Sequence, residues 1–503
     1  MAQGGFDVVL GNPPYVRQER FSELKPWLEQ NYEVYNGVAD LYAYFFELGH
    51  KLLNPGGRLG YISSSTFFKT GSGARLRNYL AERAMLEKIV DFGDLQVFAG
   101  VTTYPAIVVL KKAIPEAQTA LAILALRKSL PDNLDQCFAQ EHGTMQQARL
   151  NQASWQLEDE SQAKLRLKLT QGHPTLKEVY GSPLYGIKTG LNAAFVIDRQ
   201  IRDRLIDEDP RSAELLKPFF EGKDLKKWHA QPRDIWIIFT RRGIDIEQYP
   251  AVQNHLEQFR EQLEPKTKSW PKSDKWPGRK AGPYQWFEIQ DTVAYYKEFE
   301  KAKVFYPDIT DSQKFHLDIS GAYSGNTGYF LPINDFYVLG LLNASVTWFF
   351  LKGISDSVRG GFYRMFSQNI NRLPIPSATV EQKNSIGDLS KKCQVLSEQR
   401  YAIENNFRRR FPDLCPAERE ATLNTKLKSW WLLEFVNFQK QIKNQFKSTI
   451  PLAERNAWQD YLEGEKAKIA TLNRQISQYE TELNHEVYRL FKLTPQEIQL
   501  IEA

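Results

Sequence analysis

The chain has 503 residues, with 65 Lys and Arg against 60 Asp and Glu and a net charge of +5. This length allows two to four domains, but so small a charge does not by itself identify a nucleic-acid-binding protein. The three cysteines, Cys137, Cys393 and Cys415, lack metal-ligand spacing, which argues against a zinc site and a disulfide framework. No apolar run approaches the roughly 18 residues of a membrane helix, and no signal-peptide pattern opens the chain. We therefore expect a soluble, cytoplasmic protein with no membrane partner.

The first structural signal is an apolar run, Val8 to Leu10, that ends in the turn Gly11-Asn12-Pro13-Pro14-Tyr15. The run predicts a buried parallel strand, and ligands of α/β sheets bind at the carboxyl ends of such strands. Because two prolines fix the backbone, the Asn12 amide and the neighbouring carbonyl groups project from a rigid turn beside an aromatic ring. Such a turn can hold a flat base by its exocyclic amine. The alternative is an ordinary Pro-Pro turn with a capping asparagine.

The elements that follow alternate between strand and helix. The pattern predicts a helix over residues 40–53, a strand over 58–63, a helix over 74–83, and strands over 86–91 and 106–111. This alternation, with short Gly and Pro turns, predicts a parallel α/β sheet within residues 1–115.

Three stretches resemble the N6-adenine-specific DNA methyltransferases of the TaqI-like, restriction-linked family: Asn12 to Tyr15, Ser63 to Phe68, and Asp91 to Phe98. The resemblance implies a partial Rossmann-like methyltransferase sheet, S-adenosyl-L-methionine as methyl donor, and no metal. It assigns catalysis to Asn12, Pro13, Pro14 and Tyr15 of this chain, with a flipped adenine stacked between Tyr15 and Phe98. A core residue is the alternative reading of Phe98.

The helix that begins near residue 40 matches a family segment that walls the methyl-donor pocket, which makes Asp40 and Tyr42 candidate cofactor-binding residues. Aromatic residues at helical spacing are more often part of a hydrophobic core than of a cofactor pocket.

Later segments differ in character. Residues 116–176 are weakly patterned and predict a connecting segment. Residues 177–378 resemble the TaqI-like target-recognition domain, an α+β fold that carries DNA specificity. Residues 379–503 are helical and charged, with an apolar seam along residues 469–490 that predicts helix-on-helix packing within the chain, or a coiled coil with a partner as the alternative.

Double-stranded DNA is the expected partner of the TaqI-like region. Basic residues interleaved with tryptophans in residues 266–280 suit phosphate contacts and stacking, although a solvated linker remains an equal alternative. The candidate DNA-binding residues are Lys188, Lys223, Lys226, Lys227, Lys272, Lys275, Arg279, Lys280, Arg364 and Gln368.

The family also has a Gly-rich donor-binding loop on strands that precede the Asn-Pro-Pro-Tyr strand, and no stretch of this sequence matches it. The sequence therefore leaves three hypotheses open. The chain is a fragment of a longer methyltransferase, one subunit of a split enzyme whose partner supplies the missing half, or a sequence-specific DNA-binding module that has lost catalysis.

Overall fold

The computed structural model describes residues 4–98, 104–127, 129–271, 275–355, 357–358, 360–416 and 421–502. The chain forms two compact units. The first comprises Met1–Gly172 and Lys352–Arg364, and the second comprises His173–Leu351 and Met365–Ala503.

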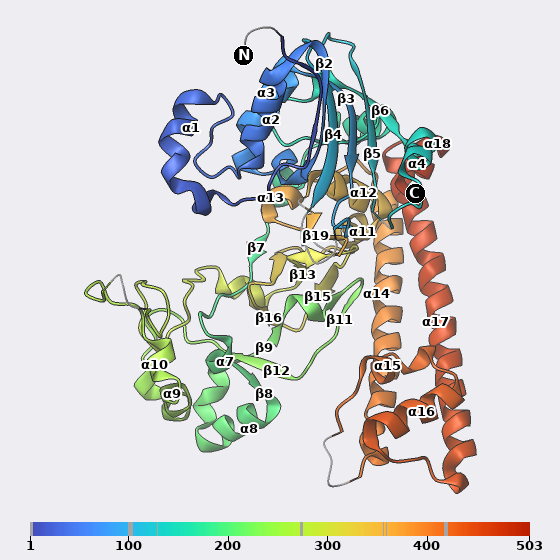
Figure 1. Ribbon diagram of the computed structural model, residues 1–503. Coiled ribbons are helices and arrows are strands. Elements are labelled where there is room, and N and C mark those ends of the chain that lie inside the picture. The colour runs from blue at the N-terminus through green and yellow to red at the C-terminus, as the bar shows by residue number, and fades with distance from the viewer. Residues whose placement is uncertain are drawn as a thin grey trace. The chain divides into compact units, whose positions relative to one another are not determined.

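The first unit is built on a six-stranded sheet of order β1-β2-β4-β3-β5-β6 (Figure 1). Its strands are β1 (Phe6–Gly11), β2 (Leu53–Ser64), β3 (Met85–Asp91), β4 (Pro105–Lys111), β5 (Ala120–Ala125) and β6 (Gly143–Gln146). Strands β1, β2, β3 and β5 share one direction, whereas β4 and β6 run the opposite way. The predicted α/β class with a Rossmann-like sheet is confirmed.

The expectation of a wholly parallel sheet is wrong for β4, which pairs antiparallel with both β2 and β3. A parallel crossover needs an intervening element, usually a helix. The described part of the connection between β3 and β4 contains none, so the chain returns in the opposite direction.

The stretch 116–176, expected to be a connecting segment, contains β5 and β6 together with α4 (Leu134–Glu141) and α5 (Glu160–Thr170). These strands are short, and β5 is a continuous apolar run without alternation. Periodicity alone does not separate such a run from a buried piece of helix.

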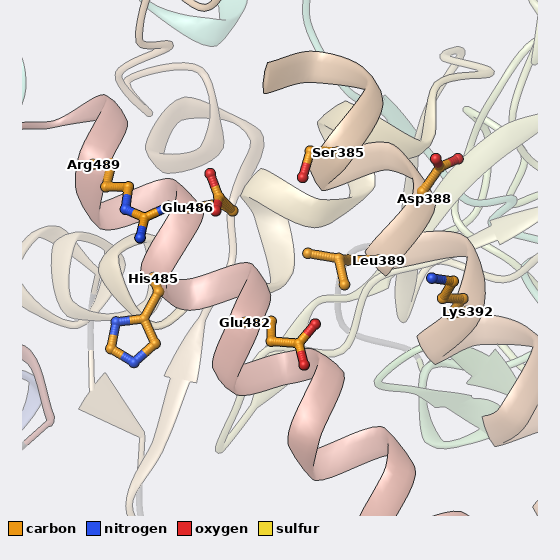
Figure 2. A pocket seen from close by; sticks show the side chains of 8 residues that line it. All are labelled: Ser385, Asp388, Leu389, Lys392, Glu482, His485, Glu486 and Arg489. Atoms are coloured by element: carbon orange, nitrogen blue, oxygen red, sulfur yellow. Dashed lines mark hydrogen bonds and ion pairs between the residues drawn. The ribbon is translucent and has the colours of Figure 1, made fainter. Parts of the chain in front are cut away.

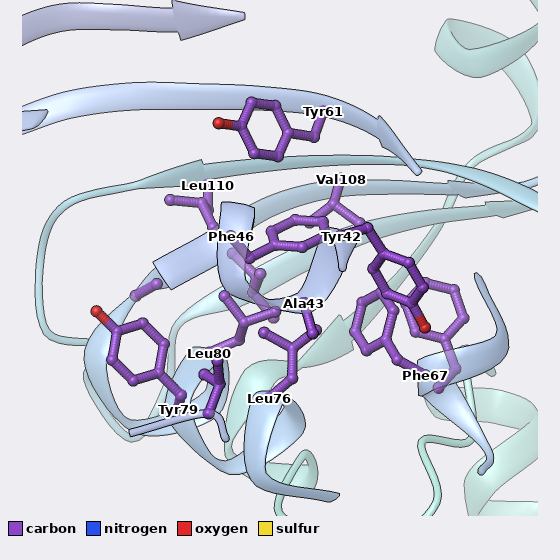
Figure 3. Close-up of a cluster of buried hydrophobic side chains, with 14 of the residues drawn as sticks. Tyr42, Ala43, Phe46, Tyr61, Phe67, Leu76, Tyr79, Leu80, Val108 and Leu110 are labelled. Atoms are coloured by element: carbon purple, nitrogen blue, oxygen red, sulfur yellow. The ribbon is translucent and has the colours of Figure 1, made fainter. Parts of the chain in front are cut away.

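Three helices accompany the first strands: α1 (Lys25–Asn31), α2 (Tyr42–Leu52) and α3 (Ala74–Arg83). Helices α2 and α3 fall where the sequence predicts them. Phe46 of α2 is fully buried, with ring centroids 5.3 Å from Tyr61 and 5.6 Å from Phe67. Figure 3 shows this core, in which side chains of α2 and α3 meet those of β2 and β4.

The second unit begins with the α+β region that the sequence predicts. Its two four-stranded sheets have the orders β16-β9-β12-β8 and β15-β13-β17-β7. The strands are β7 (Leu184–Tyr185), β8 (Val196–Asp198), β9 (Leu216–Phe220), β10 (Leu225–Lys226), β11 (His229–Ala230), β12 (Ile235–Ile238), β13 (Lys303–Pro307), β14 (Ile309–Thr310), β15 (His316–Asp318), β16 (Tyr323–Ser324) and β17 (Gly328–Leu331). The helices are α6 (Leu176–Tyr180), α7 (Asn192–Phe195), α8 (Arg199–Glu208), α9 (Pro250–Glu257), α10 (Arg260–Leu263), α11 (Phe336–Asn343), α12 (Ser345–Ile354) and α13 (Ser367–Ile370).

A long helical hairpin completes the second unit. Helix α14 (Val380–Arg408) packs along α17 (Arg455–Leu490), and α15 (Thr425–Lys428) and α16 (Phe435–Phe446) lie in the connection between them (Figure 1). Ile476 and Leu483 of the predicted seam are buried, and the thiol of Cys393 on α14 approaches the Ile476 carbonyl. The predicted packing within the chain is confirmed. Helix α18 (Pro495–Glu502) follows α17.

Within the described residues, no single helix is long and apolar enough to span a bilayer. The pair α11 and α12 meets the length and composition test only jointly, and the two helices are bent by 60° at their junction.

One predicted DNA contact, Arg279, has a structural position instead. Its side chain is 4% exposed, and burial lowers the pKa of its guanidinium to about 10. The guanidinium donates hydrogen bonds to five main-chain carbonyls, those of Thr189, Leu263, Gln285, Trp286 and Glu288. Because all of its donors face inward, Arg279 does not belong to the surface that DNA can reach.

We predict that Arg279→Ala destabilises the region around residues 263–290 by about 3 kcal/mol, because several buried carbonyls lose their charged donor together. Native-state hydrogen exchange of the Lys266 and Gln290 amides measures this local opening. The neighbouring Lys280 is exposed, so Lys280→Ala is the matched control and leaves the protection unchanged. Equal protection in both variants would contradict the structural role.

Candidate functional site at the carboxyl edge of the sheet

Three predicted site segments, residues 12–15, 65–68 and 92–98, follow directly after β1, β2 and β3. Because these strands share one direction, their carboxyl ends lie at the same edge of the sheet. This is the edge at which α/β proteins bind ligands.

The turn after β1 combines a fixed backbone with an exposed amide. Pro13 is buried and Tyr15 is half-buried against the core of the first unit, whereas Asn12 and Pro14 are exposed. The Val16 amide donates to the Pro14 carbonyl at 3.0 Å, and the Leu41 amide donates to the Val16 carbonyl at 3.0 Å. The Asn12 side chain is therefore carried by a braced backbone and is accessible to a ligand.

Close approach to β2 fixes the position of this turn. A Cβ atom on Gly11 would lie 3.1 Å from the ring of Tyr61, its partner in the β1–β2 register. A Cβ atom at position 11 would require the Tyr61 ring or the strand end to shift by a few tenths of an ångström.

Tyr42 braces the end of β2. Its buried hydroxyl is 3.1 Å from the Thr66 hydroxyl, which is 2.9 Å from the hydroxyl of Ser64. Burial raises the pKa of Tyr42 to about 12, so the phenol stays protonated near neutral pH. Sequence reasoning missed this hydroxyl chain, because its members are brought together only by the packing of α2 on β2.

Two buried hydroxyl groups at this edge have no hydrogen-bond partner among the described residues: those of Tyr15 and Ser63. Buried polar groups without partners are uncommon in folded proteins and mark positions where a ligand can supply the missing partner. Asp40, two residues before the start of α2, is half-buried and accepts a hydrogen bond from the Gln18 amide at 3.3 Å. Burial raises the pKa of the Asp40 carboxyl above its ordinary value.

The end of β3 is held by an ion pair that the sequence did not reveal. Arg127 lies 2.5 Å from the Asp91 carboxylate and also donates to the Asp91 carbonyl at 3.0 Å. The other Asp91 oxygen accepts the Gly93 amide at 3.0 Å, and Gly93 has a φ of +57°, which favours glycine. Phe98, the predicted stacking residue, is half-buried a few residues later.

A hairpin from the predicted specificity region belongs to the first unit. It consists of β18 (Ser357–Val358) and β19 (Phe362–Arg364). The Gly360 amide donates to the Asp94 carboxylate, and burial raises the pKa of Tyr363, which lies near Arg127. This hairpin, with Arg364 at its end, therefore contributes to the same carboxyl edge.

The lysines predicted to contact DNA in the second unit fall into two groups. Lys223 pairs with Glu221 at 2.8 Å, Lys227 pairs with Glu480 of α17 at 2.8 Å, and Lys226 is half-buried and donates to the Lys223 carbonyl at 2.7 Å. Their charges are already engaged within the protein.

The other candidates face outward. Lys188, Lys275, Lys280 and Gln368 are exposed, and Lys272 lies outside the described residues.

A separate cavity of about 430 Å³ lies between α14 and α17 (Figure 2). Charged side chains of both signs line it, including Asp388, Lys392, Glu482 and Arg489. Its lining includes His485 but no Phe, Tyr or Trp, whereas Tyr15 and Phe98 lie at the strand ends, which remain the better candidate site.

Three sequence families match parts of the chain. Residues 1–98 match the Eco57I restriction-modification methylase family, and residues 217–375 match the TaqI-like C-terminal specificity domain. Residues 379–487 match a domain of unknown function, DUF8810.

Individual proteins show the same relationship. The Type II methyltransferase M.PaeR7I of Pseudomonas aeruginosa is 28% identical over 402 residues, covering 74% of this chain and 65% of its own. The Type II methyltransferase M.XhoI of Xanthomonas vasicola is 27% identical over 397 residues, covering 74% of this chain and 68% of its own. Among solved structures, the Type IIL restriction-modification enzyme MmeI in complex with DNA aligns with 92% of this chain and 57% of its own, at 14% identity and a TM-score of 0.49. The chain thus spans about two thirds of the length of the two methyltransferases. Parts of the chain are therefore similar to a restriction-modification methylase family and to a TaqI-like specificity domain, and the two Type II methyltransferases are similar to it over 74% of its length.

Proposed function

We propose that this chain carries the base-holding half of a DNA adenine N6-methyltransferase of a restriction-modification system. The observation that supports this proposal is the position of Asn12: exposed, on a proline-fixed turn, at the carboxyl edge of the sheet and beside the half-buried Tyr15.

The chemistry explains why a rigid pair of acceptors suits this reaction. The lone pair of the adenine N6 atom is delocalised into the ring, so the amine is a poor nucleophile. If the Asn12 side-chain oxygen and the Pro13 carbonyl each accept one N6 hydrogen, the nitrogen rehybridises and its lone pair points out of the ring plane. Catalysis then comes from positioning and from oriented dipoles rather than from a strong base.

The target adenine is inaccessible inside duplex DNA and must leave the stack, at a cost of a few kcal/mol. Tyr15 and Phe98 are the residues that we propose to hold the flipped ring between them. The side chain of Tyr15 packs on the core, so its ring offers a fixed surface rather than a mobile one.

S-adenosyl-L-methionine would supply the methyl group, which is electrophilic because the sulfur that bears it is positively charged. Residues at the carboxyl edge fit one wall of a donor pocket: the unpartnered hydroxyl groups of Tyr15 and Ser63 lie there, together with the Asp40 carboxylate. Tyr42 acts by positioning, since its hydroxyl is committed to Thr66.

The proposed DNA contacts divide into two classes. Lys188, Lys275 and Lys280 are exposed cations suited to phosphates, which position the protein without reading sequence. Arg364 and Gln368 have the side chains that form bidentate pairs with guanine and adenine, so we propose them for base contacts.

The remaining wall of the donor pocket must lie against β1. Among the described residues this strand is paired on one side only, and its apolar side chains are open: Phe6 is 57%, Val8 59% and Leu10 77% exposed. An exposed apolar edge strand is a template for pairing. We propose that further α/β structure covers it and supplies the donor-binding loop, from the same polypeptide or from a partner subunit.

We predict that Asn12→Ala lowers the rate of N6-methyladenine formation at least about 100-fold while leaving DNA affinity unchanged, because Asn12 acts only on the reacting amine. The assay uses the tagged chain purified from its native host with any companion polypeptide, and detects N6-methyladenine in DNA by mass spectrometry. Asn31→Ala, at the exposed end of α1, is the matched control.

Unchanged methylation by the Asn12 variant would overturn the catalytic assignment. DNA binding without methylation by the wild-type protein would instead favour the hypothesis of a DNA-binding module.

We further predict that the chain purified alone self-associates through β1, and that Leu10→Asp makes it monomeric by placing a charge on the open edge. Sedimentation velocity over a range of protein concentrations measures the change. Ile114→Asp is the control, since Ile114 is 81% exposed in the same unit but lies outside the strands. Binding of S-adenosyl-L-methionine at micromolar concentration to the chain alone would show that the donor pocket needs no further wall.

A further inference from the structure

The net positive charge of the protein comes from one short segment. Residues 408–455, which join α14 to α17 and which we call the basic tip, contain ten Lys and Arg but only five Asp and Glu. The rest of the chain contains 55 of each and is neutral. The net charge of +5 for the whole protein is therefore concentrated in the basic tip.

The basic tip has its own hydrophobic core, which the lysines on and directly after α16 do not enter. Phe407 stacks on Trp430 with ring centroids 3.8 Å apart, and Phe438, Ile442 and Phe446 of α16 are buried against this group. The Trp430 indole donates to the Glu404 carbonyl at 3.1 Å. These contacts give the basic tip a fixed, packed structure on which its surface side chains are held.

Helix α16 presents a basic face on the basic tip. Its buried residues, Phe438, Ile442 and Phe446, recur every four positions. Lys440 and Lys443 lie on the opposite side of the helix and are exposed, and exposed Lys447 follows directly at its C-terminal end, so α16 has an apolar side and a basic side. Exposed Arg409, Arg410, Lys426, Lys428 and Arg455 add to the charge of the tip.

Several surface lysines and arginines elsewhere in the protein are paired with acidic neighbours. Lys301, Lys468 and Arg489 each pair with a glutamate three residues away at 2.7 Å. Within the described residues, no carboxylate pairs with Lys440, Lys443 or Lys447. Cations gathered without counter-charges repel one another, and an anionic ligand removes this cost.

The part of α17 between Trp458 and Glu480, which we call the stem, sets the distance between the basic tip and the specificity region. Glu480 of α17 binds Lys227 and the Trp228 indole, which lie between β10 and β11. From Glu480 to Trp458, beside the tip, α17 continues without interruption. These 22 residues of α-helix span about 33 Å. One turn of B-form DNA has nearly the same length, about 34–36 Å.

We propose that the basic tip binds the phosphate backbone of duplex DNA, about one helical turn away from the bases that the specificity region contacts. Lysines act as point charges that suit phosphates and carry no sequence information. The tip therefore adds affinity and holds the long axis of the duplex, without altering the recognition sequence. This inference rests on the proposed function only in taking DNA as the ligand, and it does not require catalysis.

A protein partner is the competing occupant, because Leu432 and Val436 are each 74% exposed on the same tip. The lysines on α16 and at its C-terminal end favour a polyanion over an apolar protein surface, since burying unpaired charges against such a surface is costly.

The test is fluorescence anisotropy with the full chain and a fluorescein-labelled 50-base-pair duplex of mixed sequence, over a range of salt concentrations. We expect the triple variant K440Q/K443Q/K447Q to bind about tenfold more weakly, and the slope of log affinity against log salt to fall by about 1 for each phosphate that is no longer neutralised. An 8-base-pair duplex closed by a hairpin loop is about 27 Å long, too short to reach both regions, and should show a much smaller difference between variant and wild type.

The matched control is K301Q/K468Q/R489Q, which removes the same charge from positions already paired with glutamate. A second variant, R409Q/R410Q, tests the tip independently of α16. Near-ultraviolet circular dichroism verifies that the aromatic core is intact in each variant.

Equal affinity and equal salt slopes for the triple variant, its control and the wild type would overturn the proposal and favour a protein partner. Failure of the proposed methylation would appear separately, because Asn12→Ala leaves DNA anisotropy unchanged and the triple variant retains Asn12.

Discussion

The pairing of β1 with β2 is the contact on which the candidate site depends. In the part of the chain that the structure describes, β2 is the one strand paired with β1, and the absence of a side chain on Gly11 lets the strand end lie against the Tyr61 ring. That contact sets the height of Asn12 above the sheet. The rest of the turn is fixed relative to β1. Pro13 is buried, the Pro14 carbonyl accepts a hydrogen bond from the Val16 amide, and the Val16 carbonyl accepts one from the Leu41 amide at the start of α2. A displacement of β1 would therefore move every proposed base contact at once.

The sequence predicted those features of the fold that local chemistry determines. The Asn-Pro-Pro-Tyr turn, helices α2 and α3, and the α14–α17 packing all follow from residue types at fixed spacing. It did not predict β5 and β6, or the direction of β4, because short apolar strands have no distinctive period and strand direction depends on the whole connection. The ion pair of Arg127 with Asp91 also escaped prediction, since 36 positions separate its partners in the chain.

The positions of basic residues in the sequence were the least reliable predictor of the DNA-binding surface. The basic run 266–280 contains the residue that the structure buries most completely among the predicted DNA contacts, Arg279, because a guanidinium can satisfy several main-chain carbonyls at the centre of an irregular loop. Lys227 likewise serves the packing of α17 on the specificity region. A cation counts toward a ligand surface only if it is exposed and has no carboxylate beside it, and neither condition is visible in a sequence.

Base recognition and phosphate binding place different demands on the position of a side chain, so the protein can assign them to different regions. Residues that read bases must lie on a rigid sheet or hairpin, because a bidentate pair with a base edge tolerates little error in position. Phosphate contacts tolerate more, since Coulomb attraction falls off gradually with distance. A cationic group at the end of a helical stem of about 33 Å, estimated from the helical rise per residue, can therefore hold DNA without the precision of the specificity region. Because the net excess of positive charge lies in residues 408–455, substitutions on the recognition surface need not alter this contact with the DNA backbone.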